Sequence, residues 1–268
     1  MIVSDATPLG LAHFTTIDVE PAALVAMAAG IGYSAVGLRL FPPFPGAPCY
    51  EIPVDSEAMR SMRALLADTG VTVWDIEFLT LDENFEIETI RPVLDSAAAL
   101  GARRISACGN DPDRTRLGAT LGLLCEAVGA VGLAVDLEVM PWRQVSSLAI
   151  AGEVIEQAGR PNAGLLVDAL HLSRSGSSPA SLRAMPRERI RSAQLCDAVA
   201  ERPATTVALI REARSGRLLP GDGALPLRQL VAELPDHAVL SVEVPNTGHP
   251  PEEHARRVYD ATRRVLAA

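Results

Sequence analysis

The sequence predicts an α/β fold, a single (β/α)8 barrel that spans residues 1–268. Short runs rich in Val, Ile and Leu alternate with longer amphipathic stretches, which indicates parallel strands joined by helical crossovers. Eight such strand–helix units can be counted, and eight units close a barrel. The chain length of 268 residues also suits this fold, which typically takes about 250 residues.

The expected strands are short and apolar, as suits burial on both faces of a parallel sheet. They are Pro8–Ala12, Ala35–Leu40, Val71–Phe78, Arg103–Gly109, Leu133–Met140, Ala163–Ala169, Ile190–Cys196 and Ala238–Val244. The expected helices lie between them, at Pro21–Gly30, Glu57–Thr69, Asn84–Leu100, Asp113–Ala130, Val145–Ala158, Pro179–Met185, Thr205–Ala213, Leu227–Leu234 and Glu252–Leu266. Asp55 and Ser56 are suitable caps for the second helix, and Gly70 ends it.

The main rival is an open, doubly wound sheet, which would want a glycine-rich phosphate turn after its first strand. Here the first strand leads into residues 12–16, Ala-His-Phe-Thr-Thr, which contain no glycine. The chain also has no linker, low-complexity tract or break in composition. One domain is therefore predicted.

Composition and charge narrow the class of partner. The net charge is −9 and no basic run occurs, which argues against nucleic acid but allows a small anionic substrate held by one or two arginines. No apolar run approaches the roughly 18–20 residues that cross a bilayer, and the first residues lack signal-peptide features. Four cysteines without a CxxC pair fit a reducing cytoplasm. We expect a cytoplasmic protein with a small-molecule substrate. The sequence leaves open whether the chain forms a homo-oligomer.

Four successive strand ends carry polar side chains at about the same height: Glu138, Asp168, Gln194 and Glu243. The carboxyl ends of the strands form the active site of such a barrel. Three carboxylates in one small mouth would repel each other, and a divalent cation would remove that cost. The oxygen ligand set suits Mn²⁺ or Mg²⁺ best, with Zn²⁺ or Co²⁺ as alternatives. Any one of these residues alone could be a strand-end group satisfied by loop amides.

Other polar residues follow the first strands of the barrel. Arg39 could hold a substrate carboxylate or phosphate in a fork, or form a structural salt bridge. Glu77 could pair with Arg39, act as a base or orient a ligand, and pairing is the preferred interpretation. His13 and Trp142 could line the pocket, Trp142 as a stacking surface, or serve as packing residues. The proline-rich segment Phe41–Pro53 is expected to form a lid.

The chain resembles the xylose-isomerase-like barrel superfamily, also called the sugar phosphate isomerase/epimerase family, over essentially its whole length. Strands five to eight of that family give Glu, Asp, His and Glu to one metal, at the positions of Glu138, Asp168, Gln194 and Glu243. Asp168-Ala169-Leu170-His171 resembles the family's Asp-x-x-His, and residues 220–223, Pro-Gly-Asp-Gly, resemble its Gly-acidic-Gly turn. Gln194 replaces the usual His, which is similar to the ligand set of the 3-dehydroshikimate dehydratases.

The resemblance implies proton transfer next to a carbonyl, with Glu138 and Glu243 moving protons and the metal stabilising the enolate. The first hypothesis is an isomerase or epimerase of a small polyhydroxylated carbonyl compound. The alternative is a dehydratase, which Gln194 and a carboxylate fork at Arg39 favour. A non-catalytic binding barrel is third, because a binder has no need of two opposed carboxylates. His171 would contact substrate, shuttle a proton or support a ligand, with helix capping or packing as the alternative.

Overall fold

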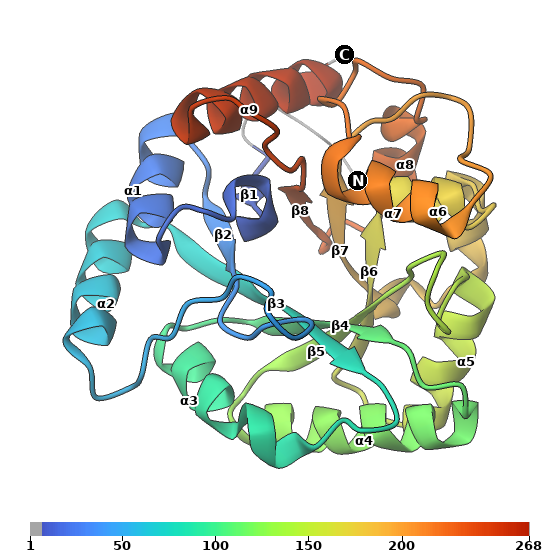
Figure 1. The fold of residues 1–268 in the computed structure, drawn as a ribbon, viewed down its shortest axis with the longest axis horizontal. Helices are drawn as coiled ribbons and strands as arrows, with labels where there is room; N and C mark the ends of the chain where they lie inside the picture. The colour runs from blue at the N-terminus through green and yellow to red at the C-terminus, as the bar shows by residue number, and fades with distance from the viewer. Residues whose placement is uncertain (1–6, 268) are drawn as a thin grey trace.

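The computed structural model describes residues 7–267, which form a closed barrel of eight parallel strands in chain order (Figure 1). The strands are β1 (Leu9–Leu11), β2 (Ala35–Leu38), β3 (Thr72–Leu81), β4 (Arg104–Gly109), β5 (Ala134–Glu138), β6 (Ala163–Asp168), β7 (Ile190–Leu195) and β8 (Val239–Val242). β1 pairs with both β2 and β8, and this last pairing closes the sheet. The predicted fold class is confirmed.

Helices surround the strands on the outside (Figure 1). They are α1 (Pro21–Ile31), α2 (Glu57–Thr69), α3 (Arg91–Ala99), α4 (Arg114–Ala130), α5 (Leu148–Ala158), α6 (Ala169–Arg174), α7 (Thr206–Ser215), α8 (Leu227–Glu233) and α9 (Pro251–Ala267). Short 3-10 helices lie at η1 (His13–Thr16), η2 (Ile87–Ile90), η3 (Pro179–Ala184) and η4 (Arg187–Arg189). None of the helices within residues 7–267 is long and apolar enough to cross a membrane.

Local signals explain most of these boundaries. Ser56 accepts a hydrogen bond from the Met59 amide and caps α2, and Gly70 ends that helix in the left-handed region at φ 71°. The expected helix Asn84–Leu100 is wrong in its first part, which forms the separate turn η2. Pro92 stands in the first turn of α3, where its missing N–H costs nothing, so it begins a helix there.

Two further differences concern the segments around β6. Pro179–Met185, expected as a helix, forms a 3-10 helix instead. The sequence also gave no sign of α6, which follows β6 without any loop. A helix of six residues is too short to show a 3.6-residue period, and the expected strand Ala163–Ala169 includes only its first residue.

The barrel interior below the mouth is polar. Arg104 of β4 forms an ion pair with Asp136 of β5, and Ser192 of β7 donates to the same carboxylate at 2.8 Å. Gly164 faces them, and a Cβ there would lie 2.7 Å from Asp136 Oδ1. Asp136 and Glu138 are two residues apart on β5, so their side chains share the inner face of the barrel. Glu138 lies nearer to the open end.

Candidate metal centre

Three side chains from β5, β6 and α6 converge at the carboxyl ends of the strands. The ligand atoms of Glu138, Asp168 and His171 all lie within 4.8 Å of one another, and all three residues are buried. Asp168 Oδ1 accepts a hydrogen bond from the His171 amide at 2.8 Å, so the carboxylate that ends β6 also caps α6. The spacing Asp-x-x-His therefore has a local cause, because a cap bonds the amide three residues on.

Gln194 and Glu243 complete the group from β7 and from the end of β8. Gln194 pairs in register with Asp168, and its Nε2 donates to Glu243 Oε1 at 3.2 Å. This bond fixes the amide so that its oxygen is the free atom. Gln194 Oε1 is buried and accepts no hydrogen bond from the residues described. Leaving such an acceptor unpaired costs about 1–3 kcal/mol, so the donor set fits a cation at this position.

Arg217 was not predicted, yet it lies within this group. Its guanidinium contacts Asp168 Oδ2 at 2.5 Å, Glu243 Oε2 at 2.9 Å and His171 Nε2 at 3.4 Å. The three carboxylates are therefore not bare, which corrects the electrostatic premise of the sequence argument. When all three carboxylates are ionised, one guanidinium leaves two negative charges, which a divalent ion would balance.

The Pro-Gly-Asp-Gly turn at residues 220–223 holds the segment that carries Arg217. The Asp197 carboxylate accepts hydrogen bonds from the Gly221 and Leu225 amides, both at 2.9 Å. Asp197 and Leu218 also exchange backbone hydrogen bonds. The turn therefore has a structural role. Nothing in its pattern marked Arg217 itself.

Burial sets the protonation of the centre. It raises the pKa of Glu138 well above the ordinary value, with the charges of Glu243 and Asp168 acting in the same direction. Burial also raises the pKa of Glu243 to about 7, although Arg217 opposes the rise. It lowers the pKa of His171 to about 4, so the imidazole is neutral at neutral pH. Burial would raise the pKa of Asp168 too, but Arg217 and His171 hold it below its ordinary value.

A cavity of about 200 Å³ borders the centre on the open side of the barrel. The centre contributes four residues to its wall, Glu138, His171, Arg217 and Glu243. Trp142 also lines it and meets His171 edge to face, with ring centroids 4.9 Å apart. The β2–α2 loop, residues 39–56, contributes Phe44, Ala47 and Pro48. The expected lid segment therefore forms part of the wall.

The residues of the first strands form a separate network. Glu77 accepts hydrogen bonds from the amides of His13 and Phe14, at 2.8 and 3.2 Å, and from Arg39 at 3.4 Å. The expected Arg39–Glu77 pair is confirmed. The Arg39 guanidinium lies over the rings of Phe14 and Phe78, 5.4 and 5.3 Å from their centroids. Arg39 lines the cavity, whereas Glu77 is buried behind it.

His13 has no exposed surface. Its Nδ1 accepts from the Arg39 amide at 3.0 Å, and its Nε2 bonds to the Val19 carbonyl at 2.8 Å. Neither His13 nor Glu77 belongs to the cavity wall. We therefore no longer expect these two residues to contact a substrate, because their polar atoms are already used to position Arg39 and the first loop.

Comparison with known proteins places this fold and centre in a family. Residues 25–265 match the family model described as xylose isomerase-like TIM barrel. The chain belongs to this family. It is also similar to the 3-dehydroshikimate dehydratases of Pseudomonas putida and Pseudomonas aeruginosa, at 24% and 25% identity over 223 residues. These residues cover 77% of this chain but only 34% of each relative, so the chain spans about a third of their length.

Solved structures show the same fold. The IOLI protein with a zinc atom superposes with a TM-score of 0.81 at 17% identity, covering 97% of this chain and 98% of that one. A probable 3-dehydroshikimate dehydratase from Bacillus anthracis gives 0.77 at 16%, covering 98% and 99%. A D-allulose 3-epimerase from Methylomonas sp., in complex with D-allulose, gives 0.70 at 16%, also covering 98% and 99%.

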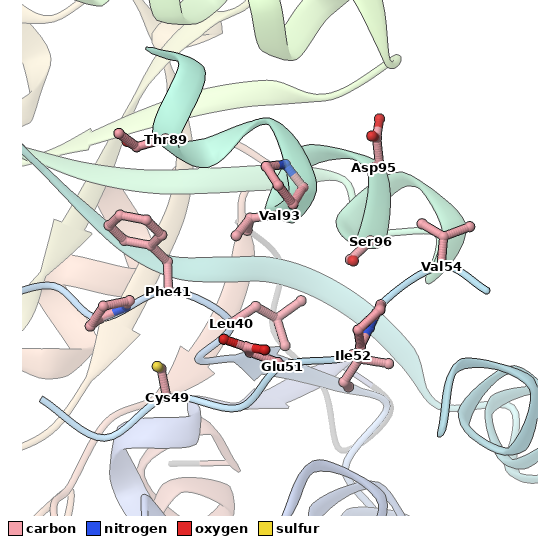
Figure 2. A pocket seen from close by; sticks show the side chains of 13 residues that line it. Leu40, Phe41, Cys49, Glu51, Ile52, Val54, Thr89, Val93, Asp95 and Ser96 are labelled. Atoms are coloured by element: carbon pink, nitrogen blue, oxygen red, sulfur yellow. The ribbon is translucent and has the colours of Figure 1, made fainter. Parts of the chain in front are cut away.

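This xylose isomerase-like barrel has a larger pocket away from the centre. Figure 2 shows it between the β2–α2 loop and α3, with a volume of about 520 Å³. Glu51 and Asp95 are its charged residues, and its wall contains no Lys, Arg or His. It lies beside the barrel rather than at the strand ends, so it shares no residue with the candidate metal centre.

Proposed function

We propose that this protein is a divalent-metal-dependent dehydratase of a small hydroxylated carbonyl compound that carries an anionic group. The observation that carries the metal dependence is the buried, unpaired oxygen of Gln194. It stands beside three carboxylates that a single guanidinium only partly neutralises. A divalent ion held by Glu138, Asp168, Gln194 and Glu243 would stabilise the negative charge that develops on a substrate carbonyl as the neighbouring proton leaves.

The chain's own residues can move that proton. Glu243 borders the cavity, so its carboxylate is placed to accept and return a substrate proton. Glu138 borders the same cavity. His171 presents a neutral imidazole whose Nε2 lies 3.7 Å from Glu138 Oε1 and whose Nδ1 has no hydrogen-bond partner. The proton that Glu243 accepts would be passed to the departing hydroxyl group, with His171 or Glu138 as relay, so that water leaves and each side chain ends in its starting protonation state.

The cavity wall favours elimination on an anionic substrate over sugar isomerisation. Four arginines and several aromatic or apolar side chains line it, among them Phe14, Met140 and Trp142. Neutral polyols are held best by mixed donors and acceptors, whereas guanidinium groups select oxyanions. The two curated relatives named as dehydratases also support a dehydratase as the first candidate. The sequence alone had favoured an isomerase or epimerase.

An isomerase or epimerase is the second candidate. The observation in its favour is that Glu138 and Glu243 both border the cavity, so that two carboxyl groups are available for removing and returning a proton. Protonation of the same enolate on another carbon or on the opposite face would give isomerisation or epimerisation in place of elimination. Only the products distinguish the two candidates.

The test compares wild type with Glu243→Gln, using Glu188→Gln as the matched control. Glu188 is exposed and precedes β7, so it lies at the opposite end of the barrel from Gln194. Metal content is measured first, and wild type should take up about one Mn²⁺ per chain. Proton–deuterium exchange and product formation are then followed with 3-dehydroshikimate and with ketoses.

Metal-dependent exchange that is lost in Glu243→Gln and kept in Glu188→Gln would support the proposal, and 3,4-dihydroxybenzoate as product would establish dehydration. Exchange and epimer formation with a ketose, without elimination, would establish the second candidate. A wild-type protein that takes up neither Mn²⁺, Mg²⁺ nor Zn²⁺ would contradict both.

A further inference from the structure

Four arginines line the cavity beside the candidate metal centre, and they differ in how their charge is balanced. Arg39 pairs with Glu77, and Arg217 pairs with Asp168 and Glu243. Within residues 7–267, neither Arg143 nor Arg214 forms an ion pair with a carboxylate. The mouth of the cavity therefore carries two cationic groups that the chain itself does not neutralise.

These two arginines come from different elements. Arg143 follows β5, and its backbone amide bonds to the Met140 carbonyl at 2.9 Å. Its Nε is buried and donates no hydrogen bond. Arg214 lies near the end of α7, and its guanidinium stands 5.0 Å from the ring centroid of Phe44 in the β2–α2 loop. Both line the same cavity, so their charges share one small space.

What distinguishes Arg143 and Arg214 is the cavity that they share, because other arginines of residues 7–267 without an ion pair, such as Arg211, lie outside it. A buried N–H without an acceptor also costs free energy that an oxyanion would recover. The lack of an anionic partner for Arg143 and Arg214 is explained if a bound ligand supplies the acceptor oxygens.

We propose that Arg143 and Arg214 form an anion subsite that holds the carboxylate or phosphate group of the substrate at the cavity mouth. The inference rests on the proposed function only in taking the bound molecule to be the substrate. It places the anion away from Arg39, for which the sequence left two roles open, a carboxylate fork and a structural salt bridge. Arg39 is only 3% exposed, and Glu77 already balances its charge.

The test uses two probes that differ in charge but hardly in size, 3,4-dihydroxybenzoate and 3,4-dihydroxybenzamide. Calorimetric titration of the Mn²⁺-loaded full chain should show the acid binding at least about tenfold more tightly than the amide. Arg143→Gln and Arg214→Gln should each reduce that preference to about threefold or less, because each removes a charged donor. Arg143→Lys, which keeps the charge, should retain part of it.

The matched control is Arg211→Gln, because Arg211 is an exposed arginine of the same helix, α7, outside the cavity wall. It should leave the preference unchanged, and every variant should bind Mn²⁺ as wild type does. Equal affinity of wild type for both probes, or a preference that survives in the double variant Arg143→Gln/Arg214→Gln, would overturn the proposal. So would a preference lost in Arg39→Gln but kept in that double variant, since the anion would then lie at Arg39.

A second titration separates this inference from the proposed function. Benzoate and benzamide lack the vicinal hydroxyl groups that would contact a metal, and they are titrated into metal-free protein. A preference for benzoate that depends on Arg143 and Arg214 supports the subsite even if the chain binds no metal. Absence of binding by all four probes would overturn the subsite, whatever the metal content.

Discussion

The two halves of the barrel mouth use similar residue types in different ways. In the half formed by β1–β4, Glu77 receives three hydrogen bonds and both nitrogens of His13 are bonded. In the half formed by β5–β8, Gln194 Oε1 and His171 Nδ1 are buried without partners. Thr16 Oγ1 and Arg39 Nε also lack partners in the first half, so what distinguishes the second half is that its unpaired atoms, an amide oxygen and an imidazole nitrogen, are metal-ligand types that lie beside three carboxylates.

Charge balance separates the halves in the same way. Arg39 and Glu77 neutralise each other one to one. In the other half, the Arg217 guanidinium forms ion pairs with two of the three carboxylates, those of Asp168 and Glu243. The charges of Arg39 and Glu77 are therefore balanced without a further ion. The second half is complete only with a further cation.

Asp168→Asn should have the largest effect of all. Asp168 caps α6, pairs with Arg217 and is a proposed ligand of the metal, so the change should lower Mn²⁺ affinity at least about 100-fold and abolish activity. Calorimetric titration with Mn²⁺ measures it. The control is Asp68→Asn, an exposed acid on α2. Unchanged Mn²⁺ affinity in Asp168→Asn would remove the distinction between the halves.

Arg217→Met should destabilise the metal-free protein by about 3–5 kcal/mol, because it leaves buried carboxylates without their partner. Saturating Mn²⁺ should recover much of that loss, since the ion supplies the missing positive charge. Urea unfolding with and without Mn²⁺ measures both values. An equal loss in the two conditions would mean that Arg217 and the ion do not act on the same carboxylates.

The pH dependence of stability tests His171. Burial lowers its pKa from the usual 6.5 to about 4, so the folded protein holds the imidazole neutral. The unfolded chain binds this proton below pH 6.5 and the folded chain only near pH 4, so stability is lost as pH falls through that window. Metal-free wild type should lose up to about 3 kcal/mol relative to His171→Asn, measured by urea unfolding. Parallel curves for the two proteins would contradict the burial of a neutral ring.

Glu77→Gln should have the smallest effect and the most local one. The amide cannot accept all three hydrogen bonds of Glu77 or balance Arg39, so we expect about 2 kcal/mol of destabilisation. Mn²⁺ affinity should not change, because this half holds no ligand. Thermal unfolding and Mn²⁺ titration together check this. A fall in Mn²⁺ affinity as large as that of Asp168→Asn would show that the halves are not independent.

The sequence predicted the barrel because alternation and strand count are properties of the whole chain, to which small boundary errors do not matter. It placed Glu138, Asp168, Gln194 and Glu243 together because strand ends share one height in a parallel barrel. The neighbouring contact between Asp168 and His171 followed from a motif whose cause is a helix cap.

Arg217, Arg143 and Arg214 could not be placed in the same way. Arg143 and Arg217 stand outside helices and strands, where no periodicity fixes the direction of a side chain, and Arg214 lies in the last turn of α7. Arg217 reaches the centre because backbone pairing between Asp197 and Leu218 holds its segment against β7, a contact between residues far apart in the chain. The two alternatives for His13, pocket lining or packing, stayed open because a sequence does not reveal that both ring nitrogens are already bonded.

The position of Arg217 bears on how the protein is made. Arg217 already neutralises part of the charge of Asp168 and Glu243, so the barrel can fold before a metal ion is bound. Metal binding would then follow folding, and the ion would share these oxygens with the Arg217 guanidinium. We expect the protein to be purified without metal and to bind added metal afterwards. The supply of metals in the cell, rather than folding, would then decide which ion it binds.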